Sequence, residues 1–196
     1  MISQTINTWV RKLPTWVLYV ILPLPGLFTF YSGLTGNLGA EPINALEREL
    51  GEYALKLLIV GLAITPLLKF AGINLIKFRR AIGVVAFGYV FVHLLVWLVL
   101  DVGILSQIWA DILKRPYVTV GMAGFALMIP LAVTSNNWSL RKMGATWRKL
   151  HKLTYAVAVL GGLHFMMLSK GFQIEPLVYL LIIVLFLVAR GRKLLR

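Results

Sequence analysis

The sequence predicts an all-α integral membrane protein, a bundle of six transmembrane helices with both termini in the cytoplasm. Hydrophobic residues make up 59% of the 196 residues and charged residues only 14%, a composition outside the range of soluble proteins. Apolar segments recur at lengths near the roughly 20 residues that cross about 30 Å of hydrocarbon. Most Lys and Arg residues stand at the ends of these segments, as membrane topology requires.

The first two predicted spans flank an acidic loop. The first covers about 16–31 and is interrupted by Pro23 and Pro25. We interpret it as a span and not as a secretory signal, because it is long for a signal and no Ala-x-Ala site follows it. A short surface helix is expected at 41–50, and the second span is predicted at about 51–70.

Four further spans are predicted after a short basic turn. They cover about 81–100, 117–134, 150–168 and 176–189. The segment 101–116 is expected to be a polar connection. We find no internal repeat, no low-complexity stretch and no linker, so residues 1–196 are expected to form a single membrane domain.

The charges divide unevenly between the two sides of the predicted membrane. With six spans both termini share one side, and that side carries 15 of the 20 Lys and Arg residues, whereas all seven acidic residues fall on the other. The positive-inside rule therefore places both termini in the cytoplasm and the acidic loops in the periplasm of a Gram-negative cell. We expect a multi-pass protein of the bacterial inner (cytoplasmic) membrane. The basic residues on the acidic side are Arg48, Lys56, Lys114, Arg115 and Lys170.

Charge and cysteine content exclude several classes of function. A formal net charge of +13 often accompanies nucleic-acid binding. Here the basic residues mark the ends of spans, so no nucleic-acid partner is expected. The chain has no cysteine, which excludes disulfides, iron–sulfur clusters and thiolate ligands. Metal binding is therefore left to imidazole, carboxylate or thioether groups.

The three histidines of the chain are the candidate metal ligands. His93 lies in the third predicted span, thirteen residues beyond Arg80, and His164 lies in the fifth, thirteen residues beyond His151. These two spans run in the same direction, so His93 and His164 are expected at matching depth, roughly 20 Å from the cytoplasmic ends of their helices. Two imidazoles at one level on neighbouring helices suit the axial positions of a b-type haem.

The geometry of the fifth span leaves alternatives open for His151. A separation of thirteen residues puts His151 and His164 about 140° apart on a straight helix. Gly161 and Gly162 permit a kink that brings them together, or His151 serves a different partner helix. Small residues near the two deep histidines, Gly161 and Ala86, leave room for a flat macrocycle. Each histidine can instead hydrogen-bond to a neighbouring helix or relay protons.

A sequence motif at the start of the fifth span resembles that of a known family. After Thr134 and Ser135 comes a basic loop, then the pattern Gly-x-x-Trp-x-x-Leu-His-x-x-x-Tyr from Gly144 to Tyr155, with His164 following. This combination resembles the ferric-reductase-like transmembrane family, whose haem-binding core corresponds to about residues 50–168.

The short six-span layout is similar to one branch of that family. Its members are haem-binding membrane subunits paired with a periplasmic molybdopterin-containing methionine sulfoxide reductase. The resemblance implies that this chain is the electron-transfer (redox) subunit of an oxidoreductase system. The partner would carry out the terminal reduction that repairs oxidised periplasmic proteins.

The resemblance also implies a set of haem ligands. Ferric reductases and NADPH oxidases stack two haems between one histidine pair spaced by 14 residues and another spaced by 13. Here His151 and His164 match the second pair, and His93 matches the outer member of the first. The inner member is Arg79, and a guanidinium is a poor iron ligand. Arg79 is therefore a candidate for binding a haem propionate, and the resemblance implies one or two haems b.

The electron donor is also expected from the resemblance. Ferric reductases continue into a cytoplasmic flavin and nicotinamide domain, whereas no Gly-rich dinucleotide fingerprint occurs in this sequence. Electrons are then implied to come from the membrane quinone pool or a flavin reductase, with FMN as a further cofactor of the family.

Two other functions fit parts of the pattern. The first is a stand-alone transmembrane ferric or quinone reductase without a molybdoenzyme partner. The second is a small transporter or proton channel with histidine relays. Against the channel, all seven carboxylates fall at or outside the predicted outer face, whereas proton pathways usually contain carboxylates within the membrane.

Overall fold

The computed structural model describes residues 2–168 and 173–191, and these ranges contain helices and no strand. Lys170 and the C-terminal basic residues Arg192, Lys193 and Arg196 lie outside the described residues. Short π and 3-10 segments are labelled η. The elements in order are α1 (Ile2–Lys12), α2 (Trp16–Ile21), α3 (Leu24–Leu34), α4 (Pro42–Pro66), η1 (Leu67–Ala71), η2 (Ile76–Phe78), α5 (Arg79–Val96), η3 (Trp97–Val102), α6 (Leu105–Lys114), α7 (Pro116–Val133), α8 (Asn137–Met143), α9 (Ala145–Leu150), α10 (Leu153–Leu168) and α11 (Ile174–Gly191).

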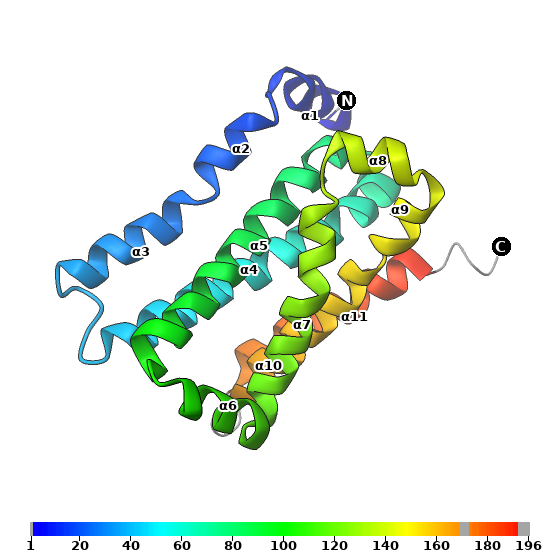
Figure 1. Ribbon diagram of the computed structural model, residues 1–196. Coiled ribbons are helices and arrows are strands. Elements are labelled where there is room, and N and C mark those ends of the chain that lie inside the picture. Colours follow the sequence, from blue (N-terminus) through cyan, green and yellow to red (C-terminus); the bar gives the residue numbers. More distant parts are fainter. Residues whose placement is uncertain (1, 169–172, 192–196) are drawn as a thin grey trace.

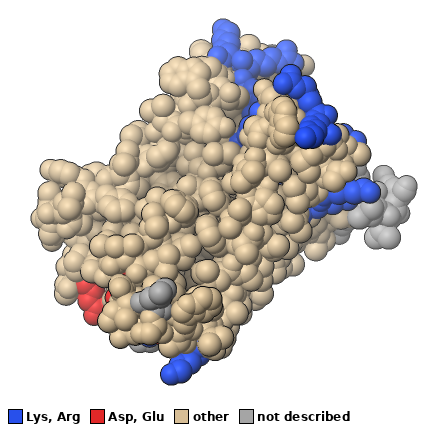
Figure 2. Space-filling model, in the orientation of Figure 1, with Lys and Arg blue, Asp and Glu red and all other residues tan. Residues whose placement is uncertain are grey.

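The long helices pack side by side as one bundle (Figure 1). Helices α1, α8 and α9 gather at one end, which we call the basic end, and α6 lies at the opposite end, which we call the acidic end. Figure 2 shows Lys and Arg side chains concentrated at the basic end, and Asp and Glu side chains near the acidic end. The described residues thus show the charge division expected from the sequence.

Helix α4 is the centre of the bundle because it contacts α3, α5, α10 and α11. Its buried residues recur mainly at four-residue spacing, which places an apolar stripe along one side of a helix. The stripe comprises Leu46, Leu50, Ala54, Leu58 and Leu62. The helix expected at 41–50 is confirmed from Pro42 onward, but it is not a separate surface helix, because it continues into the second span as the first part of α4 and buries Leu46 and Leu50.

Five described helical segments are long and apolar enough to cross a membrane. They match the first, second, third, fourth and sixth predicted spans, and are Trp16–Leu34, Pro42–Ala71, Ile76–Val102, Pro116–Val133 and Ile174–Gly191. The fifth predicted span corresponds to α10, whose 16 described residues are fewer than the length of a full span. The connection expected at 101–116 contains the amphipathic helix α6.

A tyrosine hydroxyl holds the N-terminal helices against the bundle. The oxygen of Tyr89 in α5 donates to the carbonyl of Leu22 (2.8 Å) and accepts from the amide of Gly26 (3.0 Å). An uninterrupted helix would join that carbonyl directly to that amide. Because Tyr89 is inserted between them, α2 and α3 are separated at the predicted Pro23–Pro25 break, and a side chain at Gly26 would overlap the tyrosine ring.

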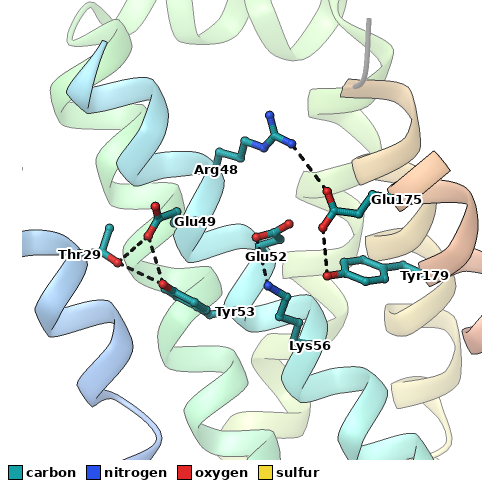
Figure 3. A network of polar contacts seen from close by, with 8 residues as sticks. All are labelled: Thr29, Arg48, Glu49, Glu52, Tyr53, Lys56, Glu175 and Tyr179. Atoms are coloured by element: carbon teal, nitrogen blue, oxygen red, sulfur yellow. Dashed lines mark hydrogen bonds and ion pairs between the residues drawn. The ribbon is translucent and has the colours of Figure 1, made fainter. Parts of the chain in front are cut away.

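Polar contacts tie α3 and α11 to α4 at the acidic end (Figure 3). The carboxylate of Glu49 accepts hydrogen bonds from Thr29 (2.7 Å) and Tyr53 (3.1 Å). On the other side of α4, Glu175 of α11 forms an ion pair with Arg48 at 4.0 Å. The Arg48 and Glu175 side chains are about half exposed, so this ion pair adds little stability and mainly fixes where α11 begins.

Near the basic end of α4, an arginine side chain replaces a backbone hydrogen bond that a proline removes. Pro66 has no amide hydrogen, so the carbonyl of Leu62 lacks its usual helical donor. Arg190 of α11 supplies the missing donors, because its Nη2 and Nε lie 2.7 and 3.1 Å from that oxygen. Nη2 also donates to the carbonyl of Gly61. Arg190 therefore holds α11 against α4 at this end.

We expect Tyr89→Phe to lower the free energy of unfolding by about 1–3 kcal/mol, because a buried amide and carbonyl lose their partner. Thermal unfolding of the protein in detergent measures this loss. The matched control is Tyr31→Phe, since the Tyr31 side chain is exposed on the same N-terminal segment. Equal melting temperatures of the two variants would show that the Tyr89 hydroxyl does not hold α2 and α3 against the bundle.

Candidate functional site

The structure brings together two of the three histidines named from the sequence. His93 of α5 and His164 of α10 have ring centroids 6.2 Å apart, and their ring planes cross at 83°. Both line a cavity of about 280 Å³ whose walls come from α4, α5, α7 and α10. The cavity lies toward the acidic end, because Glu47 and Asp101 also line it.

A backbone hydrogen bond fixes the tautomer of each imidazole. The Nδ1 of His93 lies 2.8 Å from the carbonyl oxygen of Glu47, and the Nδ1 of His164 lies 2.7 Å from that of Tyr117. A carbonyl oxygen can only accept, so each Nδ1 carries the hydrogen and donates. Nε2 of each neutral ring therefore keeps its lone pair, which is the form that binds a metal.

His93 and His164 are placed where they would hold the iron of a haem. An imidazole nitrogen binds a metal at about 2 Å, so two rings on opposite sides of one metal have centroids about 6 Å apart. The separation of His93 and His164 matches that distance. Among the described residues no group of three or more His, Cys, Asp or Glu could hold a bare ion. Two imidazoles alone suit an iron whose other four ligands come from a porphyrin.

The third histidine lies at the basic end, apart from the other two. His151 stacks on Trp147 with ring centroids 3.7 Å apart, and its Nε2 lies 3.0 Å from the Thr134 hydroxyl oxygen. That hydroxyl donates its hydrogen to the carbonyl of Pro130 (2.6 Å), so it accepts from Nε2. In a neutral His151 the lone pair is then on Nδ1, the reverse of the arrangement at His93 and His164.

A second cavity of about 850 Å³ lies beside His151. Among its described lining residues six are cationic and none is acidic, and aromatic rings including Trp147 and Tyr155 complete the wall. Such a lining suits an anionic group attached to a planar ring. The cations are Lys77, Arg79, Arg80, Arg148, Lys152 and Arg190.

Arg79 is held inside this second cavity by a neighbouring helix. One of its terminal nitrogens donates to the Thr65 hydroxyl of α4. Its buried Nε has no hydrogen-bond partner among the described residues. A buried guanidinium nitrogen normally has an acceptor, so Arg79 is suited to bind a ligand oxygen and, without a lone pair to offer, unsuited to bind iron.

Sequence reasoning missed the groups that hold the two deep histidines. The carbonyls of Glu47 and Tyr117 belong to the backbone, so residue type gives no signal for them. Gly51 and Gly121 lie against the imidazoles of His93 and His164, and a glycine within a predicted span was the only available signal. Gly161 lines the cavity with His164 as expected, whereas Ala86 is buried elsewhere in the core.

Comparison with known proteins identifies relatives over most of the chain. The family model "Ferric reductase like transmembrane component" matches residues 50–162. A protein of Agrobacterium fabrum named "Protein-methionine-sulfoxide reductase heme-binding subunit MsrQ" is 49% identical over 182 residues, covering 92% of this chain and 83% of the relative. Proteins of the same name from Brucella ovis and Brucella abortus are each 45% identical over 176 residues, covering 89% of this chain and 80% of each relative. No solved structure matches the chain.

The fold and the relatives agree on the location and the class of the protein. Five apolar helices of spanning length, the transmembrane family model and the bacterial relatives make it a multi-pass protein of the bacterial inner membrane. The matched segment contains α5, α7 and most of α4 and α10, the four helices that surround the histidine cavity. The chain belongs to the ferric-reductase-like transmembrane component family.

Proposed function

We propose that this protein is the haem-binding membrane subunit that passes electrons to a periplasmic methionine sulfoxide reductase. The observation that carries the proposal is the pair His93 and His164, 6.2 Å apart, each presenting Nε2 in its lone-pair form. The names of relatives that cover most of the chain support the same assignment.

His93 and His164 hold the iron of one b-type haem in this proposal. The haem supplies a one-electron redox change when bound. The chain's own contribution is to orient the two imidazoles through the Glu47 and Tyr117 carbonyls and to exclude water with apolar walls such as Leu55, Val90 and Phe125. A dry shell and a firmly hydrogen-bonded axial ligand are the means by which a protein sets the potential of such a centre.

Electrons enter at the second cavity, between His151 and Arg79. Its six cations suit either the propionates of a second haem or the phosphate of FMN. For a second haem, Arg79 would bind a propionate and His151 would bind the iron. A quinone from the membrane pool is the proposed electron donor, and aromatic rings such as Trp147 offer a surface for its head group. The haem content of the protein distinguishes a second haem from the other ligands.

The proposed topology has six spans and cytoplasmic termini. Helix α10 completes the six as the fifth span in chain order, because it packs against α7, α4 and α11 within the bundle. The basic end then faces the cytoplasm, in agreement with the positive-inside rule. Residues 1–196 form one domain in this proposal, with a haem-binding core at about 50–168.

The partner docks at the acidic end, which the topology places in the periplasm. The histidine cavity lies toward this end, so the path for an electron from this cavity to the periplasm is shorter than the path to the cytoplasm. The partner, a molybdopterin-containing enzyme in this proposal, reduces methionine sulfoxide in oxidised proteins. This chain is the redox subunit of that system.

Haem analysis of histidine variants tests the iron ligands. We expect His93→Ala and His164→Ala each to lose the low-spin b-type absorption bands, because one axial ligand is removed. His151→Ala changes the histidine of the other cavity, so it should keep the bands of the haem held by His93 and His164. A pyridine haemochrome assay gives haem per chain, and a fall by about one haem in His151→Ala indicates a second haem at the basic end.

Absorption spectra, proton conduction and co-purification separate the alternatives. Low-spin bands that persist in a double His93→Ala, His164→Ala variant would rule out the proposed ligands. A colourless protein that conducts protons in liposomes would favour a histidine-relay channel. A haem protein that reduces ferric iron and never co-purifies with a periplasmic enzyme would favour a stand-alone reductase.

Single cysteines test the topology, since the natural chain has none. Ala40 precedes α4 at the acidic end and Lys142 lies in α8 at the basic end, and both are exposed. We expect a membrane-impermeant maleimide to label Ala40→Cys in intact spheroplasts and to label Lys142→Cys only after the membrane is opened. The reverse pattern would place the basic end outside and contradict the proposed direction of electron flow.

Charge reversal tests the docking surface. We expect Glu41→Lys to slow oxidation of the reduced haem by the partner several-fold at low salt, because steering by complementary charge is lost. Glu41 is exposed at the acidic end. The control is Lys142→Glu at the basic end, which should leave the rate unchanged. Equal rates in all three proteins would place the docking surface elsewhere.

A further inference from the structure

The two histidines are held by the same arrangement on two helix hairpins. In the hairpin of α4 and α5, His93 donates from Nδ1 to the carbonyl of Glu47, and a glycine, Gly51, follows four residues later on α4. In the hairpin of α7 and α10, His164 donates in the same way to the carbonyl of Tyr117. The residue four positions after Tyr117 is again a glycine, Gly121.

Both glycines touch the imidazole that their helix holds. A Cβ atom at Gly121 would lie 2.9 Å from Nδ1 of His164 and 3.0 Å from its Cε1. A Cβ atom at Gly51 would lie 3.3 Å from the same two atoms of His93. The ordinary carbon contact distance is about 3.5–4.0 Å. A side chain would therefore push on the ring at both positions, and harder at Gly121.

The helix geometry explains why the glycine stands four residues after the carbonyl. A helical carbonyl accepts from the amide four residues later, so the carbonyls of Glu47 and Tyr117 already face Gly51 and Gly121. An imidazole that shares such a carbonyl must approach it beside the residue that supplies the amide. Glycine leaves that approach fully open, because it has no Cβ.

The correspondence between the hairpins extends to their opposite ends. Thr65 of α4 accepts from Arg79 at the start of α5, and Thr134 at the end of α7 accepts from His151 before α10. Each hairpin therefore uses a backbone carbonyl near one end and a threonine hydroxyl near the other. The sequence shows no repeat because the carbonyls belong to unlike residues and the threonines hold unlike side chains.

We propose that Gly51 and Gly121 are positioning residues for His93 and His164. Each lets its imidazole sit close enough to a helical carbonyl to donate from Nδ1, which keeps Nε2 unprotonated and aims the ring into the shared cavity. The inference rests on the proposed haem site for its redox consequence. A strong Nδ1 hydrogen bond makes an imidazole a more basic ligand, and a more basic ligand favours the ferric state.

The test compares Gly121→Ala and Gly51→Ala with the matched control Gly88→Ala. At Gly88 of α5 a Cβ would meet nothing within 4 Å, and Gly88 does not line the histidine cavity. We expect the midpoint potential of the haem to shift to more positive values in Gly121→Ala, less in Gly51→Ala, and not at all in Gly88→Ala. The low-spin ferric EPR signal should change in the same order.

A second measurement does not depend on haem. In ¹⁵N-histidine-labelled protein without haem, NMR should show Nδ1-protonated rings for His93 and His164 and a mixture of tautomers in the two positioning variants. The inference would be overturned if, in Gly51→Ala and Gly121→Ala, the histidine tautomers and the midpoint potential were the same as in the parent protein. Absence of haem from the parent protein would overturn the proposed function. The NMR tautomers of His93 and His164 would still test the role of the two glycines.

Discussion

Two hydrogen bonds from imidazole to helix backbone determine what the centre of this protein can do. A histidine within a membrane bundle needs a partner for its N–H group, because no water replaces a missing one. His93 and His164 both meet this need with a carbonyl of the neighbouring helix. The same bonds leave each ring with its lone pair on Nε2. The requirement for satisfied hydrogen bonds thus also makes the two rings suitable for binding metal.

The surrounding helices are arranged to keep these bonds in place. Helices α4 and α7 supply the carbonyls, and each packs along the helix whose histidine it holds. At the acidic end, Glu49 and Glu175 connect α4 to α3 and α11. At the basic end, Arg190 of α11 donates to the Leu62 carbonyl that Pro66 leaves without a backbone donor. Helix α4 is therefore fixed at both ends, and the register between the Glu47 carbonyl and His93 is fixed with it.

Much of this structure could be predicted from the sequence, and what was missed has a physical reason. Hydropathy and charge placement predicted the helical class and most spans, because a bilayer demands apolar length and cationic ends. The closeness of His93 and His164 was predicted from their equal depth together with the expectation that their helices are neighbours. The Glu47 and Tyr117 carbonyls could not be predicted, since every residue has one. The continuity of α4 through 41–50 was not predicted, because the acidic residues of that segment favour a surface helix over the first turns of a membrane span.

The two cavities occupy opposite ends of one bundle, and this separation has an energetic consequence. In the proposed topology an electron that passes from the cavity at Arg79 to the cavity at His93 moves outward through the low-dielectric part of the membrane. An elementary charge that crosses the whole membrane potential exchanges about 2.3 kcal/mol per 100 mV with the field. A cytoplasm at negative potential repels the electron in the direction of the periplasm. Repair outside the cell membrane would then draw part of its driving force from the potential maintained by respiration.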